Sequence, residues 1–246
     1  MQEFKREVEE RVNTNSRNDS LRASANALVK ETVPSQYSYN FSWLGRPIIQ
    51  YPQDIVALQE IIWSVKPDLI IETGIAHGGS LIFSASMLEL NAACGGPQSA
   101  EVLGVDIDIR SHNREAIEAH PMSKRITMIQ GSSTAAAVIE QVEFKAEGKR
   151  CVLVCLDSNH THDHVLAELH AYARLTSVGS YCVVFDTFIE DLPGSLYPDR
   201  PWGPGNNPKT AVREYLKTHD EFQIDKQIDH KLLISVAPDG YLRRVR

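Results

Sequence analysis

The central part of the chain alternates short apolar runs, rich in β-branched residues, with longer stretches that carry apolar positions at helical spacing. Uninterrupted apolar runs of this length are typical of parallel strands that are buried on both faces. Such runs predict strands at 68–72, 102–106, 126–130, 151–156 and 181–185. Because helical stretches separate the runs, the pattern indicates βαβ units in a mostly parallel sheet.

The pattern weakens toward both ends of the chain. Residues 1 to about 30 predict a polar helix, and 33–53 predict a long ordered loop with aromatic residues, which could cover a ligand or contact another subunit. A helix is expected to begin at Pro52–Asp54, with Asp54 as its cap or first-turn acid. We therefore divide the chain into an N-terminal segment, 1–53, and a main domain, 54–246.

Further along the chain, helices are predicted at 109–119, 134–148 and 209–218, with Asp108 and Asn207 as candidate caps of the first and the last. The Pro- and Gly-rich stretch 189–209 lacks periodicity, so it predicts a substrate lid or a clasp between subunits. Two closing strands are predicted at 222–225 and 231–236, and the last seven residues are expected to form a basic surface tail.

Composition narrows the class of protein. The chain has 246 residues, of which 42% are hydrophobic and 23% charged, as expected for a globular chain with one core. A net charge of −7 argues against a broad nucleic-acid-binding surface. No stretch has the length of a membrane span, and the charged N-terminus lacks the apolar core of a signal peptide. The four cysteines show no C-x-x-C spacing, so free thiols and a cytoplasmic location are expected.

Polar residues follow the carboxyl ends of successive predicted strands. They are Glu72, Asp106, Gly131-Ser132, Asp157 and Asp186. Ligands bind at this edge of open parallel sheets. Each acid taken alone could cap the helix that follows it, but the whole succession favours a ligand-binding cleft. An acid at the tip of the second strand commonly accepts hydrogen bonds from ribose hydroxyls, which is the role expected of Asp106.

The turn after the first of these strands, 73–80, predicts the ligand class. Gly74 can adopt backbone angles that other residues avoid, so a ligand can approach the main chain there. The loop lacks the lysine of a phosphate-binding G-x-x-x-x-G-K-S loop, and its glycine spacing differs from G-x-G-x-x-G. Glu72 just before the loop would repel a phosphate and attract a cation. An ordinary βα turn in another α/β enzyme remains the alternative.

Together, Glu72-x-Gly74-x-x-x-Gly78-x-Ser80 resembles the first motif of S-adenosylmethionine (SAM) methyltransferases. The stretches IIETGIAHGGSLIFSASML, GVDIDIR, LDSNHTHDHV, GSYCVVFDT and RPWGPGNNPKTAV resemble the cephalosporin hydroxylase family and the related macrolide-sugar O-methyltransferases, over roughly 40–245. The resemblance implies a Rossmann-like class I SAM methyltransferase fold, a doubly wound, mostly parallel sheet with an antiparallel closing strand. It also implies a SAM site formed by Glu72, Gly74, Ala76, Gly78, Ser80, Asp106, Ser132 and Asp157, with Ser132 near the adenine.

The same resemblance implies a divalent metal near the acceptor hydroxyl. Asp157 and Asp186 end adjacent strands, so their carboxylates can converge on Mg²⁺, which prefers oxygen ligands. Asp157-Ser158-Asn159-His160 matches the D-x-x-H pattern of related sugar O-methyltransferases. Phe185 stands where that pattern has a glutamate. Metal binding is then weaker or absent, or another group such as Thr187 or Glu190 supplies a further oxygen.

His160 is the candidate base of a Mg-assisted O-methyltransferase, with Asp157 beside it as a catalytic residue. A metal lowers the pKa of a hydroxyl, and a neutral imidazole can then take its proton. His162 and His164 compete for this role or form a solvated first helical turn. A zinc site built on the H-x-H pair lacks an evident third ligand.

The resemblance implies a small hydroxylated acceptor: a sugar, a glycosylated metabolite or a cell-surface saccharide. It also implies a homo-oligomer. Two alternatives remain at this point. A SAM-binding protein without catalytic activity is favoured by Phe185, and a metal-dependent hydroxylase would use a triad such as Asp157, His160 and His162.

Overall fold

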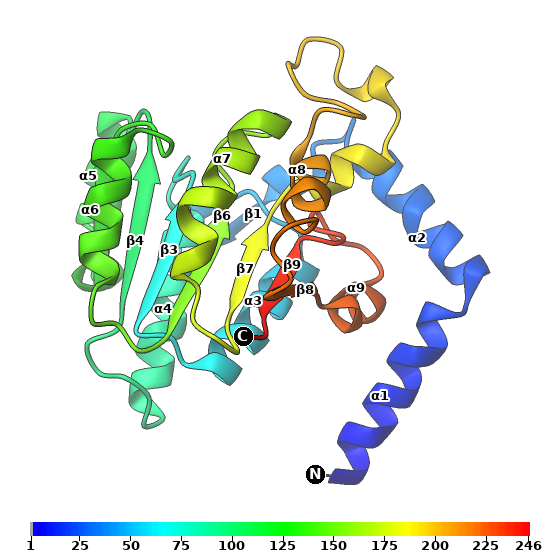
Figure 1. Ribbon diagram of the computed structural model, residues 1–246, viewed down its shortest axis with the longest axis horizontal. Coiled ribbons are helices and arrows are strands. Elements are labelled where there is room, and N and C mark those ends of the chain that lie inside the picture. Colours follow the sequence, from blue (N-terminus) through cyan, green and yellow to red (C-terminus); the bar gives the residue numbers. More distant parts are fainter. Residues whose placement is uncertain (1) are drawn as a thin grey trace.

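The computed structural model describes residues 2–246, and its central element is a seven-stranded sheet with the order β5-β4-β3-β6-β7-β9-β8 (Figure 1). The strands are β3 (Leu69–Thr73), β4 (Glu101–Asp106), β5 (Ile126–Gln130), β6 (Val152–Leu156), β7 (Tyr181–Val184), β8 (Phe222–Ile224) and β9 (Tyr241–Arg244). The first five are parallel, and β9 runs antiparallel to both of its neighbours. This topology confirms the predicted Rossmann-like class.

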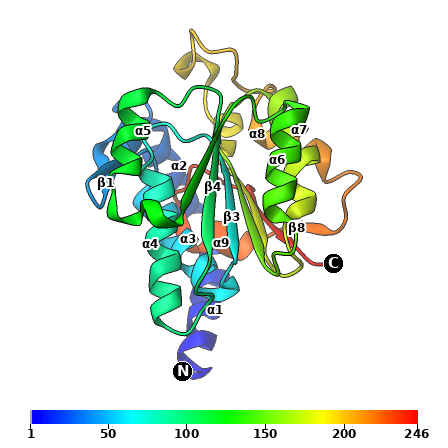
Figure 2. The ribbon, with the colours of Figure 1, turned by 90° about the vertical axis from the view of Figure 1, so that its left-hand side faces the viewer.

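Helices cover both faces of the sheet, as Figure 2 shows along its edge. One face carries α3 (Pro52–Val65), α4 (Gly79–Ala93) and α5 (Ser111–Glu118), and the other carries α6 (Ala136–Ala146), α7 (His162–Tyr172) and α8 (Pro208–Tyr215). Side chains of one strand alternate between two apolar clusters: Ile70 joins the first, whereas Leu69 and Ile71 join the second. Burial on both faces explains why these strands read as continuous apolar runs.

The N-terminal segment contains more regular structure than expected. It forms α1 (Gln2–Ser16), α2 (Asp19–Thr32), the 3₁₀ turn η1 (Tyr37–Asn40), and a hairpin of β1 (Phe41–Trp43) and β2 (Arg46–Ile48). The prediction of a loop over 33–53 was therefore wrong in part, because three-residue strands are too short to show a period. The hairpin packs on α4: Trp43 Nε1 donates to Ser86 Oγ at 2.9 Å. The division of the chain at residue 53 stays a prediction.

Asp54 lies in the first turn of α3 as predicted, but its carboxylate serves another purpose than capping. It is fully buried and accepts hydrogen bonds from Ser235 Oγ (2.6 Å), Val236 N (2.9 Å) and the Tyr241 hydroxyl (2.7 Å). Burial raises the pKa of this carboxyl from 3.8 to about 6. Asp54 thus ties α3 to the C-terminal strand across 187 residues.

The closing hairpin was predicted correctly in its first strand, since β8 lies within 222–225, but wrongly in its second. Where a strand was predicted at 231–236, the chain forms α9 (Lys226–Leu232) and then a loop. The strand between β7 and β8 is instead β9, which lies in the stretch expected to be a basic tail. Tyr241 and Leu242 are fully buried, while Arg244 Nη1 donates to the carbonyls of Arg174 (2.8 Å) and Thr176 (2.6 Å). The two arginines of β9 suggested a polar tail, although the first two residues of this strand belong to the hydrophobic core.

Four short 3₁₀ turns connect the helices and strands after β4. The 3₁₀ turns are η2 (Pro121–Arg125), η3 (Ala173–Leu175), η4 (Thr187–Asp191) and η5 (Gly194–Leu196). Asn207 caps α8 in a capping box, as predicted, whereas α5 begins without the side-chain cap expected from Asp108. The four cysteines are free thiols. Within residues 2–246, no helix combines the length and the apolar character needed to cross a membrane.

Candidate functional site

A cleft of about 480 Å³ opens at the carboxyl edge of the parallel strands, where ligand binding was predicted. The glycine loop after β3, Asp106, Asp157 and Asp186 line one side of it. The other side is formed by the N-terminal hairpin region around Gln50 and by the segment 192–206, which rises as the gold coil at the top of Figure 1. The cleft therefore joins three parts of the chain that are distant in sequence.

The glycine loop lies so close to the chain just after β6 that a side chain at Gly74 would not fit between them. Gly74 has φ +91°, and a Cβ built there would lie 2.1 Å from the carbonyl oxygen of Asp157. Asp106 Oδ2 accepts hydrogen bonds from the backbone nitrogens of Ile75 (2.7 Å) and Ala76 (3.2 Å). Ala76 itself has φ +46°, so these bonds hold the loop in a conformation that a non-glycine residue rarely adopts. Asp106 lines the cleft and at the same time shapes the loop.

Two residues that the sequence did not single out complete this loop. Asn113, at the start of α5, donates to the Ala76 carbonyl at 2.9 Å and accepts from Arg46 Nη2 at 3.1 Å. Arg46 Nε, from β2, also donates to the His77 carbonyl at 3.0 Å. The pairs are separated by between 31 and 67 residues along the chain, and no local motif marks them. Residues of β2, of α5 and of the tip of β4 thus hold the glycine loop in place.

Glu72 lies behind the cleft and not on its wall. Its side chain is 4% exposed and accepts a hydrogen bond from Ser80 Oγ, and Ser80 itself lines the cleft. Burial raises the pKa of the Glu72 carboxyl from 4.5 to about 7, although the Ser80 hydrogen bond opposes this. Ser80 is therefore the link between the buried Glu72 carboxyl and the cleft.

Two other predicted cofactor residues lie outside the lining of the cleft. Gly78, with φ +82°, begins α4, where a Cβ would overlap the Ile117 side chain. Ser132 shares a hydrogen bond of 3.0 Å with Thr134. The structure therefore gives Gly78 a packing role and leaves the adenine contact of Ser132 a prediction.

The predicted acids after β6 and β7 converge with His160. Ligand atoms of Asp157, His160 and Asp186 lie within 4.8 Å of one another, and His160 Nε2 is 3.2 Å from Asp186 Oδ2. Burial and the negative charge of Asp186 raise the pKa of the Asp157 carboxyl well above its usual value. Burial also raises the pKa of Asp186, and His160 opposes that rise.

This group of three suits a divalent cation. Asp186 raises the pKa of the Asp157 carboxyl, and a divalent ion would supply positive charge that favours the ionised form of both acids. Carboxylate oxygens and an imidazole nitrogen are both common ligands of divalent metals. The residues present thus fit a metal. Position 185 carries no glutamate, and the third possible ligand beside the two carboxylates is His160.

The two further oxygen donors considered from sequence are engaged elsewhere. Phe185 is buried in the apolar cluster, and the Thr187 hydroxyl, also buried, donates to the Pro238 carbonyl at 2.7 Å. Glu190 accepts from Gly205 N at 2.7 Å and from Asn207 Nδ2. These contacts give no support to Thr187 or Glu190 as metal ligands.

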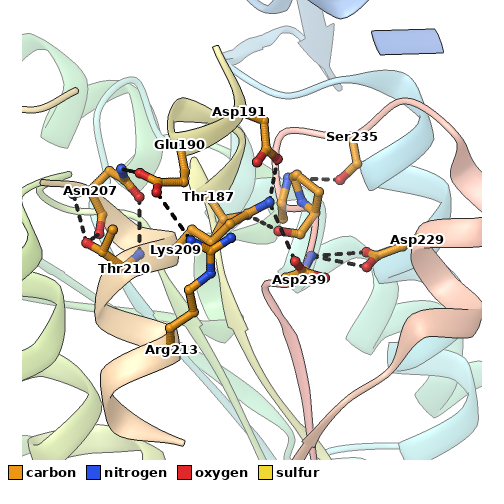
Figure 3. Close-up of polar contacts among 12 residues, drawn as sticks. Thr187, Glu190, Asp191, Asn207, Lys209, Thr210, Arg213, Asp229, Ser235 and Asp239 are labelled. Atoms are coloured by element: carbon orange, nitrogen blue, oxygen red, sulfur yellow. Dashed lines mark hydrogen bonds and ion pairs between the residues drawn. The ribbon is translucent and has the colours of Figure 1, made fainter. Parts of the chain in front are cut away.

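Figure 3 shows how the chain on either side of the segment 192–206 is anchored. Glu190 joins Asn207 and Arg213, and Lys209 lies between Asp191 and Asp239, with its Nζ 3.6 Å from Asp239 Oδ2. Lys209 is only 3% exposed, so its ammonium group is buried, whereas the carboxylate of Asp191 is partly exposed to solvent. The network fixes η4, and with it the turn that carries Asp186, against α8.

The other two histidines of the cluster after β6 have structural partners. His162 Nδ1 is 2.8 Å from Thr210 Oγ1, and His164 Nε2 is 3.1 Å from both Ser133 Oγ and Ser158 Oγ. Neither belongs to the group of three, so a triad of Asp157, His160 and His162 is not assembled. His160 instead meets the Trp202 ring edge-on, with the ring centroids 4.8 Å apart.

The sequence matches known O-methyltransferases. Residues 35–245 match the family model "Rhamnosyl O-methyltransferase/CmcI". A curated rhamnosyl O-methyltransferase of Mycobacterium tuberculosis is 33% identical over 226 residues, which cover 88% of this chain and 85% of that protein. Its counterpart from Mycobacterium leprae is 30% identical over 208 residues, 82% of each chain.

Solved structures share the fold at low identity. CmcI-D160 with Mg and SAM has a TM-score of 0.58 and 20% identity, covering 85% of this chain and 78% of that one. The O-methyltransferase TomG from Streptomyces achromogenes, in complex with SAM, has a TM-score of 0.51 and 13% identity, covering 81% and 79%. At these identities the likeness extends to the fold alone.

Proposed function

Because this chain belongs to the rhamnosyl O-methyltransferase/CmcI family, we propose that it is a SAM-dependent O-methyltransferase that methylates a hydroxyl group of a sugar or a glycosylated molecule. One observation supports this most directly. The cleft brings a glycine loop, which lacks the features of a phosphate-binding loop, next to a group of two carboxylates and an imidazole. Such a cleft has room for a methyl donor on one side and an acceptor hydroxyl on the other.

Residues at the β3 end of the cleft are suited to the cofactor. When bound, SAM would supply the methyl group for the acceptor oxygen. Glu72, acting with Ser80, attracts the cofactor's ammonium when its carboxyl is ionised. Asp106 has lone pairs left for the ribose hydroxyls beside the backbone nitrogens it already accepts from. Gly74 and Ala76 leave the main chain open to the ligand.

Asp157 and Asp186 are suited to hold Mg²⁺, and a bound Mg²⁺ would lower the pKa of a nearby acceptor hydroxyl. His160 then takes the proton of the acceptor hydroxyl, and Asp186 beside it stabilises the imidazolium that results. Fixing the reacting groups in the cleft contributes as well, because donor and acceptor must be aligned.

A sugar acceptor is supported by two observations. The curated relatives are named rhamnosyl O-methyltransferases. The outer wall of the cleft carries the aromatic side chains Tyr39, Tyr197 and Trp202 together with Arg200, which combine flat apolar faces with polar groups. Such surfaces suit a ring that exposes both C–H bonds and hydroxyls.

Cofactor binding is tested first, by calorimetry and thermal shift with SAM and with its demethylated product. A dissociation constant in the micromolar range, or about −8 kcal/mol, is expected. The dinucleotide NAD is the control, because the loop lacks phosphate-binding features. Absence of heat and of a thermal shift with both SAM forms would refute the proposal.

Methyl transfer is tested next, with radiolabelled SAM, Mg²⁺ and a rhamnoside acceptor. The same acceptor with its sugar hydroxyls acetylated is the matched control. Label in the first product only supports a sugar O-methyltransferase. A SAM-binding protein without catalytic activity is the second candidate, favoured by Phe185, and it predicts cofactor binding without any transfer.

A further inference from the structure

Gln50 brings the N-terminal segment into contact with the acidic group of the cleft. It lies between β2 and α3, lines the cleft and is only 4% exposed. Its Nε2 donates to Asp157 Oδ2 at 3.3 Å. Among residues 2–246, no other side chain forms a hydrogen bond with this carboxylate. Its Oε1 is buried and has no hydrogen-bond partner in that part of the chain.

The backbone on both sides of Gln50 is fixed. Ile48 at the end of β2 and Tyr51 at the start of α3 are each 2% exposed, and the Tyr51 hydroxyl bonds to Thr32 Oγ1. The Pro47 carbonyl lies so close to Gly79 that a Cβ there would be 2.1 Å from its oxygen. The amide of Gln50 is therefore presented to Asp157 by a rigid support.

The surroundings of Asp157 explain what such an amide can do. Asp186, Glu72 and Glu168 all add negative charge around this carboxylate. A neutral amide nitrogen can hold the carboxylate without adding charge and without occupying the place of a cation. Because Nε2 bonds to Oδ2, Oδ1 remains for another ligand. The unpaired Oε1 is a costly buried acceptor, which a donor entering with the ligand would satisfy.

We propose that Gln50 is a positioning residue of the metal site. Its Nε2 orients the Asp157 carboxylate for a divalent cation, and its Oε1 accepts a hydrogen bond from a water or hydroxyl that enters with the ion. This inference rests on the proposed function, and it gives the N-terminal segment a part in the site beyond that of a cover. Groups that orient a metal ligand in this way commonly change metal affinity 10- to 100-fold, roughly, when removed.

The test compares Gln50→Leu with wild type and with Gln53→Leu. Gln53 is a matched control because it lies three residues away, is half-buried and does not line the cleft, and its Oε1 also has no hydrogen-bond partner within residues 2–246. Mn²⁺ binding is measured by electron paramagnetic resonance and calorimetry. Gln50→Leu should bind Mn²⁺ about 10- to 100-fold more weakly, while Gln53→Leu should equal wild type.

Two further readouts separate positioning from a structural defect. SAM affinity in Gln50→Leu should equal that of wild type, since the glycine loop is unchanged. Turnover should return at saturating Mn²⁺, so that the activation constant rises while kcat and the KM for SAM do not. If Gln50→Leu is unstable, Gln50→Asn, which keeps an amide but is one methylene shorter, replaces it with the same expectation.

Wild-type Mn²⁺ affinity in a folded Gln50 variant overturns the inference, and so does loss of turnover that saturating Mn²⁺ does not restore. If those variants still bind SAM and transfer methyl groups, the proposed function stands. If wild type itself binds no Mn²⁺, both the inference and the metal assignment fall, and SAM binding then decides the remainder of the proposed function.

Discussion

Replacing Gly74 by alanine tests the close backbone contact on which the cleft is built. The added Cβ would lie 2.1 Å from the Asp157 carbonyl oxygen, 2.6 Å from its carbon and 3.1 Å from Ser158 Cα. All three atoms are backbone, so no side chain can rotate to make room. The chain after β3 and the chain after β6 must therefore separate, which displaces the Asp157 carboxylate as well.

The magnitude follows from two contributions. Overpacking a tight site costs about 1–3 kcal/mol. A left-handed conformation costs a non-glycine residue about 1–2 kcal/mol, and Gly74 has φ +91°. Together these predict a loss of about 2–5 kcal/mol of unfolding free energy for Gly74→Ala. At roughly 2–4 °C per kcal/mol for a chain of this size, a loss of about 3 kcal/mol lowers Tm by about 6–12 °C.

Urea unfolding measures this loss, and Gly45→Ala is the matched control. Gly45, in the turn of the β1–β2 hairpin, has φ +85°, but no atom of residues 2–246 beyond its chain neighbours lies within 4 Å of its ideal Cβ. It should lose only the conformational contribution, about 1–2 kcal/mol. Because Asp157 moves in Gly74→Ala alone, that variant should also bind SAM and Mn²⁺ more weakly. Equal losses of stability in the two variants, with unchanged ligand binding, would refute the steric argument.

Three further outcomes are expected. In the folded state the pKa of Glu72 is about 7, above its ordinary value of 4.5. The contribution of this carboxyl to stability is therefore greatest below pH 4.5 and is lost as pH rises to about 7. Glu72→Gln should flatten the dependence of Tm on pH in the ligand-free protein over that range. His160→Ala should keep SAM affinity by calorimetry but lose turnover about 10²- to 10⁴-fold; unchanged turnover would remove His160 from the reaction. Lys209→Met should lower the unfolding free energy in urea by about 1–3 kcal/mol, below the loss for a fully buried pair because Asp191 is 51% exposed; no loss would contradict the role of this ion pair.

The central fold could be predicted because its strands are buried on both faces. β5 was predicted with its observed limits, 126–130, and the other four parallel strands were placed to within one residue. Burial forces continuous apolar, β-branched sequence on such strands. The hairpin at 41–48 was missed because strands of three residues there show no clear period, and β9 was missed because its two arginines suggested a surface tail although Tyr241 and Leu242 are buried.

The acids of the site could be predicted for a topological reason. Successive parallel strands end at the same edge, so Asp106, Asp157 and Asp186 had to come near one another. The groups that orient them could not be predicted. Gln50 reaches Asp157 across 107 residues, and Arg46 reaches Asn113 across 67. Such contacts depend on how a non-periodic segment folds over the sheet, and one sequence carries no local signal of that.

His160 is the residue at which two interpretations of the chemistry meet, because one nitrogen cannot bind a cation and accept a proton at the same time. Its Nε2 lies 3.2 Å from Asp186 Oδ2, a position from which it could bind a cation held by Asp186 or accept a proton from the acceptor hydroxyl. Phe185 packs in the core and offers no carboxylate, so an ion is held either by two carboxylates and water oxygens or by the imidazole as well. Mg²⁺ prefers the first arrangement, whereas Zn²⁺ binds imidazole readily. Turnover that is supported by Mg²⁺ and lost with Zn²⁺ therefore argues that His160 is the base, and turnover that requires Zn²⁺ argues that the proton goes elsewhere.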